Sequence, residues 1–127
     1  MNARILVVED EVLIAMEIAQ ALEAEGFEVV GPCHTVLQVL DVLRQPDCCD
    51  AVTLDANLHN ESAQLVARAL LKLEKPFIVI SGYDANQLPD ALAAAPHLAK
   101  PLRTEDLITR LRSLLAARGA DGAPDGC

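Results

Sequence analysis

Five polar residues that could share one chemical site each follow a short apolar run. Glu9 and Asp10 follow residues 5–8, Asp55 follows 51–54, Ser81 follows 77–80, and Lys100 follows 97–99. Three crowded carboxylates repel one another unless a cation or a basic group lies close to them. Oxygen ligands alone indicate magnesium, and Lys100 would supply a further positive charge. Asp55 could then attack phosphorus as a nucleophile and carry an acyl phosphate, to which the Ser81 hydroxyl could donate a hydrogen bond.

The apolar runs read as β-strands that alternate with helical patterns. We expect five strands, at Ile5–Val8, Val29–Gly31, Ala51–Leu54, Phe77–Ile80 and His97–Ala99. The first, third and fourth are nearly continuous in apolar residues, as in strands that are buried on both faces. The alternation predicts an α/β fold with a doubly wound five-stranded parallel sheet. Because ligands bind beyond the carboxyl ends of such strands, the five polar residues should meet at one edge.

Helical signals fill the segments between the strands. Apolar stripes are clearest in the first helix, at Ile14, Ile18 and Leu22, and in the last, at Leu107 and Leu111. Pro89 and the alanines around it predict a short or irregular fourth helix. The expected ends are N-caps at Thr35, Ser62 and Thr104, and a stop for the first helix at Gly26.

Length and composition restrict the kind of protein. The 127 residues suit one domain, which we expect at 1–117, and the breaker-rich segment 118–127 predicts a disordered tail. A net charge of -9 with no basic run argues against nucleic-acid binding. The apolar runs are too short to serve as a signal peptide or to span a membrane, so a cytoplasmic location is expected. The four cysteines lack zinc-site spacing and are expected to remain thiols.

The sequence resembles the receiver domain of bacterial response regulators over residues 4 to about 117. Four segments carry the resemblance, each at a strand end and in the order of that family. They are Ile5-Leu6-Val7-Val8-Glu9-Asp10-Glu11, Thr53-Leu54-Asp55-Ala56-Asn57-Leu58, Val79-Ile80-Ser81-Gly82-Tyr83 and Lys100-Pro101-Leu102. The resemblance implies a flavodoxin-like (βα)5 fold with strand order 2-1-3-4-5.

The resemblance also implies roles for single residues. Asp55 would be the phosphoacceptor, with Glu9, Asp10, Asp55 and the backbone carbonyl of Asn57 as magnesium ligands. Ser81 and Lys100 would be the switch hydroxyl and the phosphoryl-binding lysine, with a cis bond between Lys100 and Pro101. Such a protein is no conventional enzyme, but it catalyses its own phosphorylation and dephosphorylation.

The resemblance suggests partners as well. The donor would be a histidine kinase or a phosphotransfer protein, and an effector would bind the face formed by the fourth helix, fifth strand and fifth helix. The Ser-Gly-Tyr segment is similar to the single-domain receivers called the FAT GUY group, whose kinases are often of the HWE type. Tyr83 could shape access to Asp55. His97 stands where many receivers carry the Tyr or Phe of the switch, and by itself it reads as a packing residue.

Two other functions fit part of the pattern. A pure interaction module could keep the pocket without being phosphorylated, although the complete set of polar residues argues against it. A magnesium-dependent phosphohydrolase would need a second acid and a cap over the substrate, and neither is evident in the sequence.

Overall fold

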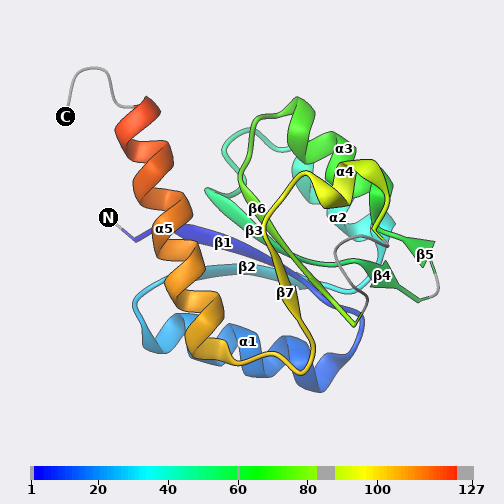
Figure 1. Ribbon diagram of the computed structural model, residues 1–127, viewed down its shortest axis with the longest axis horizontal. Helices are drawn as coiled ribbons and strands as arrows, with labels where there is room; N and C mark the ends of the chain where they lie inside the picture. Colours follow the sequence, from blue (N-terminus) through cyan, green and yellow to red (C-terminus); the bar gives the residue numbers. More distant parts are fainter. Residues whose placement is uncertain (1, 60, 83–87, 123–127) are drawn as a thin grey trace.

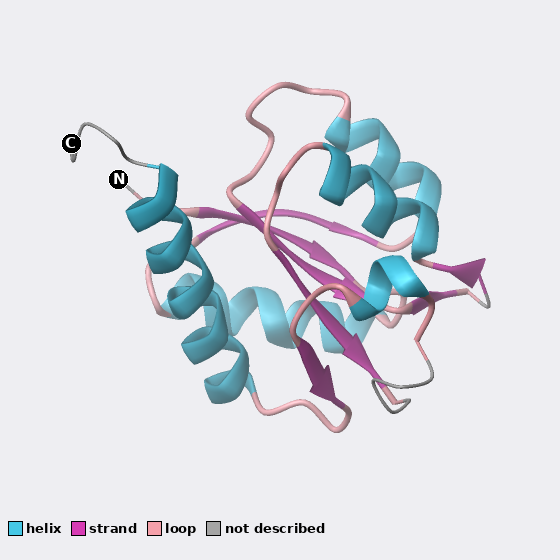
Figure 2. Ribbon diagram, turned by 45° about the horizontal axis from the view of Figure 1, so that its top comes forward, coloured by secondary structure: helices cyan, strands magenta, loops and turns pink. Residues whose placement is uncertain are grey.

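The protein is a parallel β-sheet covered by helices on both faces (Figures 1 and 2). The computed structural model describes residues 2–59, 61–82 and 88–122. The five sheet strands lie in the order β2-β1-β3-β6-β7. Their bounds are β1 Arg4–Val8, β2 Glu28–Cys33, β3 Ala51–Asp55, β6 Phe77–Ser81 and β7 His97–Ala99. Since β6 and β7 are the fourth and fifth strands of this sheet, the predicted order 2-1-3-4-5 is confirmed.

The helices form two layers, one on each face of the sheet (Figure 1), and each layer packs on its own apolar core. One face carries α1 (Val12–Ala24) and α5 (Thr104–Gly122), and the other carries α2 (Val36–Leu43), α3 (Gln64–Lys72) and α4 (Asp90–Ala93). In β1, Ile5 and Val7 face the first core, while Leu6 and Val8 face the second. This alternation explains why the strand is apolar at every position.

The helix ends follow local chemistry, but two of the three predicted N-caps are misplaced. The Thr35 side chain accepts a hydrogen bond from the Gln38 N–H and caps α2, as predicted. Gly26 ends α1 with a φ of 91°, and the chain closes through a hydrogen bond from the Phe27 N–H to the Leu22 carbonyl. Ser62 was wrong as the N-cap of α3, because it belongs to a strand and Ala63 holds the N-cap position, although the Ser62 Oγ accepts a hydrogen bond from the Gln64 N–H. Thr104 was wrong as the N-cap of α5, because it is the first residue of that helix.

Three further features were absent from the sequence interpretation or only partly foreseen. The strands β4 (Asn57–Leu58) and β5 (Glu61–Ser62) form a small antiparallel pair directly after Asp55. The α4 helix has only 4 residues, which confirms the prediction of a short element. The α5 helix continues to Gly122, so the predicted tail boundary at residue 117 lies inside it, and residues 123–127 lie outside the described chain.

The end of β2 is irregular where it approaches the end of β1. Its pairing with β1 shifts between Leu6 and Val8, so that Val8 lies opposite Cys33. Gly31 has a φ of 86° here, and a Cβ atom on it would lie 2.7 Å from the Cys33 nitrogen. Glycine is therefore required at this bulge.

Among the helices of the described residues, none has the length and apolar character needed to cross a membrane.

Candidate functional site

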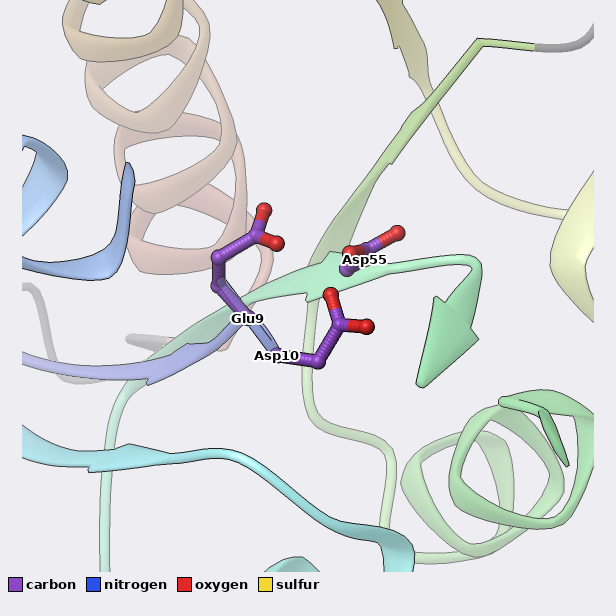
Figure 3. Close-up of side chains that lie close together, drawn as sticks. All are labelled: Glu9, Asp10 and Asp55. Atoms are coloured by element: carbon purple, nitrogen blue, oxygen red, sulfur yellow. The ribbon is translucent and has the colours of Figure 1, made fainter. Parts of the chain in front are cut away.

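The polar residues singled out in the sequence meet at the carboxyl edge of the sheet. Glu9 and Asp10 follow β1, Asp55 is the last residue of β3, Ser81 is the last of β6, and Lys100 follows β7. Figure 3 shows the side chains of Glu9, Asp10 and Asp55 turned toward one another. Oxygen atoms from all three carboxylates lie within 4.8 Å of one another. Parallel strands thus bring Asp10 next to Asp55, although the two residues are 45 positions apart in the sequence.

Backbone N–H groups hold each carboxylate in place. The Asn57 N–H donates to Asp55 Oδ1 at 3.1 Å, and the Glu11 N–H donates to Glu9 Oε2 at 3.1 Å. The third bond, also 3.1 Å, runs from the His59 N–H to Asp10 Oδ2. The segment from Asn57 to His59, which contains β4 and follows β3, therefore supplies donors to two of the three acids.

Lys100 is the positive group of the site. Its Nζ lies 3.4 Å from Asp55 Oδ2 and 3.6 Å from Glu9 Oε1. The cis bond predicted between Lys100 and Pro101 is confirmed. One lysine cannot balance three carboxylates, so the cluster keeps an excess of negative charge.

The pKa values of the three carboxyl groups and of Lys100 are shifted by this crowding and by burial. Burial, together with the nearby Asp55 carboxylate, raises the pKa of Glu9 to about 8. Burial also raises the pKa of Asp55, although Lys100 opposes the shift. For Asp10 burial is the largest single effect and would raise the pKa, but several hydrogen bonds together, led by the one from the His59 N–H, lower it. Burial would lower the pKa of Lys100, but the charges of Asp55 and Glu9 raise it.

A pocket of about 340 Å³ opens directly above these groups. It exposes oxygen-bearing side chains and one ammonium group, which is a suitable lining for a hydrated divalent cation and a phosphoryl group. Glu9 does not line the pocket and is buried, with an exposed fraction of 1%. The lining residues are Asp10, Glu11, Asp55, Asn57, Ser81, Gly82 and Lys100.

The remaining predicted residues have different places. His97 lies on β7 opposite Val79, and its Nε2 is buried without a hydrogen-bond partner in the part of the chain that the structure describes. Its packing role stays a prediction. Tyr83 lies outside the described residues, so its effect on access to Asp55 also stays a prediction. Sequence reasoning missed Glu11 as a lining residue and the backbone of His59 as a donor, because both depend on loop geometry.

The comparison with protein families identifies the kind of domain. A family model described as the response regulator receiver domain matches residues 5–112. The chain belongs to this family. It is therefore a receiver domain of two-component signal transduction, and not a conventional enzyme.

Individual relatives agree with this assignment. The transcriptional regulatory protein PdtaR of Mycobacterium tuberculosis is 27% identical over 91% of this chain and 62% of its own length. The sensory transduction protein RegX3 of Mycolicibacterium smegmatis is 33% identical, over 96% of this chain and 56% of its own length. The chain thus spans less than two-thirds of either relative.

Solved structures extend the comparison to the fold. SdrG from Sphingomonas melonis Fr1 superimposes with a TM-score of 0.76 at 33% identity, covering 90% of this chain and 97% of SdrG. A CheY-like receiver domain protein from Methanospirillum hungatei JF-1 gives a TM-score of 0.82 at 25% identity, covering 95% and 99%. The receiver architecture therefore extends over almost the whole chain.

Proposed function

We propose that Asp55 accepts a phosphoryl group from a histidine kinase in a magnesium-dependent reaction, and that the modified domain acts as a protein-interaction switch. One observation carries the proposal. Asp55 is 3% exposed, lines the pocket, and lies close to two other carboxylates and to the Lys100 ammonium group. A buried acid beside both anions and a lysine, at the wall of an open pocket, is suited to nucleophilic attack on a charged phosphoryl group.

The donor set fits a magnesium ion. Glu9 Oε1 is buried and accepts no hydrogen bond from the described residues, and every candidate ligand atom is an oxygen. We propose that Glu9, Asp10, Asp55 and the backbone carbonyl of Asn57 hold the ion, directly or through water. When bound, the ion neutralises negative charge on the acids and on the incoming phosphoryl group.

Each protein group then has a defined task. An oxygen of Asp55 forms a bond to phosphorus while the bond from phosphorus to the donor histidine nitrogen breaks, and that nitrogen takes a proton from solvent. Lys100 pairs with a phosphoryl oxygen as the transferred charge arrives. The Ser81 hydroxyl donates to another phosphoryl oxygen and so registers the modification. Attack of water on phosphorus later releases phosphate and restores the Asp55 carboxylate.

The proposal includes partners and a location. The donor is a histidine kinase, with the HWE type as one class, or a phosphotransfer protein. The effector binds the face formed by α4, β7 and α5, since Ser81 and Lys100 lie at its upper edge. The switch would operate in the cytoplasm, where kinases obtain ATP. The net charge of -9 supports a protein partner over nucleic acid.

Intact-mass spectrometry tests the reaction. The protein is incubated with magnesium and a small phosphodonor, and in parallel with a phosphorylated kinase. We expect a gain of one phosphoryl group that Asp55→Asn abolishes. Asp41→Asn is the matched control, because Asp41 is an exposed acid on α2 far from the pocket lining.

Two results would contradict the proposal. An unmodified wild-type chain with both donors would favour a pure interaction module. Rapid multiple turnover of phosphate esters, with no stable gain in mass, would favour a hydrolase instead.

A further inference from the structure

The turn between β2 and α2 is hydrogen-bonded to both peptide groups of Glu9. The Glu9 N–H donates to the Cys33 carbonyl at 3.0 Å. On the other side, Nδ1 of His34 lies 2.8 Å from the Glu9 carbonyl oxygen. Because a carbonyl oxygen can only accept, Nδ1 must carry a proton and donate it. The imidazole of His34 therefore anchors the backbone from which the buried acid of the site projects.

His34 is itself fixed by the cap of α2. Its backbone N–H donates to Gln38 Oε1 at 2.7 Å, and the Gln38 N–H donates to Thr35 Oγ1 at 3.2 Å. This pair of bonds is a variant of the capping box, in which the first turn of a helix and the preceding residues satisfy one another's donors. The start of α2 thus determines where the His34 ring lies.

The bulge in β2 brings His34 level with Glu9. Leu6 pairs with Val30, and a regular parallel ladder would place Pro32 opposite Val8, but Val8 pairs with Cys33. The extra residue shifts β2 by one position relative to β1. As a result, His34 follows the last pair and lies level with Glu9, where a regular ladder would place Cys33. Gly31 makes this possible through its φ of 86°. The bulge and the capped turn together place Nδ1 of His34 within hydrogen-bonding distance of the Glu9 carbonyl oxygen.

We infer that His34 is a positioning residue, whose hydrogen bond fixes the Glu9–Asp10 backbone against the repulsion among the carboxylates of the site. The inference rests on the proposed function, because the backbone that His34 holds carries Glu9 and Asp10, two of the proposed Mg²⁺ ligands. Glu9 is almost fully buried and cannot move outward without breaking its bonds to Cys33 and His34. Outer residues that orient a ligand in this way typically change metal affinity when they are replaced.

Two complementary substitutions separate the hydrogen bond from the packing of the ring. His34→Asn keeps an N–H donor close to the place of Nδ1 but removes the ring. His34→Phe keeps a ring and removes the donor. We expect His34→Phe to bind Mg²⁺ about five-fold more weakly in titration calorimetry, from the loss of one hydrogen bond. Its phosphorylation rate with a small phosphodonor at low Mg²⁺ should fall in parallel, and His34→Asn should restore most of both.

Val39→Ala controls for a general loosening of α2. Val39 is fully buried in α2 and does not touch the site, so this variant should lower the melting temperature while leaving the Mg²⁺ affinity unchanged. The inference is overturned if His34→Phe binds Mg²⁺ like the wild type, if His34→Asn is as weak as His34→Phe, or if Val39→Ala reproduces the loss.

A direct spectroscopic test does not depend on the reaction. In the nitrogen-15 NMR spectrum of the wild-type protein above the titration range of histidine, His34 should show the tautomer protonated at Nδ1. The opposite tautomer would refute the hydrogen bond and the inference with it. If instead the tautomer is as expected but the wild type neither binds Mg²⁺ nor accepts phosphate, then the proposed function has failed while the hydrogen bond stands.

Discussion

Removing the charge of Glu9 should stabilise the metal-free protein while weakening its response to magnesium. Glu9→Gln keeps the size of the side chain and an oxygen that can accept from the Glu11 N–H. It removes one of three carboxylates whose oxygens lie within 4.8 Å of one another. The buried side chain cannot relieve this repulsion by turning into solvent, because its exposed fraction is 1%.

The magnitude follows from the distances in the site. At an effective dielectric constant of about 20, each carboxylate repels Glu9 by about 3 kcal/mol or more at this separation. The Lys100 ammonium at 3.6 Å attracts it by about 4 to 5 kcal/mol on the same scale. The Lys100 side chain is 30% exposed, so water screens this attraction more than the buried repulsion. Where Glu9 is ionised, at about pH 8 or above, a net gain of about 2 kcal/mol is expected for Glu9→Gln, or roughly 5 to 10 °C in melting temperature.

The pH dependence has a defined sign. The folded protein raises the pKa of Glu9 to about 8, so folding favours the neutral acid. The contribution of Glu9 to the stability of the metal-free wild type is therefore fully present below the ordinary range of a glutamate and is lost as the pH rises through about 8. The advantage of Glu9→Gln should grow between pH 6 and pH 8.5.

Calorimetric melting in the presence of a chelator, and again with Mg²⁺, measures both effects. Glu9→Gln should melt higher than wild type with chelator. It should gain less from Mg²⁺, because the stabilisation by a bound ligand is smaller when its affinity is lower. Glu23→Gln is the control, since Glu23 is an exposed acid on α1 and should change little in either condition. A lower melting temperature for metal-free Glu9→Gln at pH 8 would refute the argument, because the attraction to Lys100 would then outweigh the repulsion.

Three further predictions test the scaffold and the cation. Gly31→Ala should lower the free energy of unfolding by about 2 kcal/mol or more, and Gly26→Ala by only about 1 kcal/mol. Both glycines have a positive φ, but only a Cβ at Gly31 would meet backbone atoms. Urea unfolding measures both values. Leu111→Ala, at a fully buried position of α5, should cost about 3 kcal/mol by the same method, and a cost below that of Gly26→Ala would contradict the core assignment. Asp10→Asn should weaken Mg²⁺ binding about ten-fold or more in titration calorimetry, while Asp41→Asn should leave it unchanged.

The sequence alone determined the sheet and the members of the site. Short, nearly continuous apolar runs that alternate with helical patterns indicate strands that are buried on both faces, and parallel strands bring their carboxyl ends to one edge. The sequence alone therefore assigns five polar residues to one cluster: Glu9, Asp10, Asp55, Ser81 and Lys100. Their order along the chain was sufficient for this.

The tertiary structure decided how those residues are held. The raised pKa of Glu9 depends on burial by segments distant in sequence, and no local pattern encodes it. The contact from His34 depends on a one-residue bulge in β2, which the sequence showed only as a glycine before a proline. The β4–β5 pair, which brings the His59 N–H to Asp10, also arises from pairing between short segments with little propensity of their own. Local propensities set the elements, whereas register and burial, which are properties of the assembled chain, set the geometry of the site.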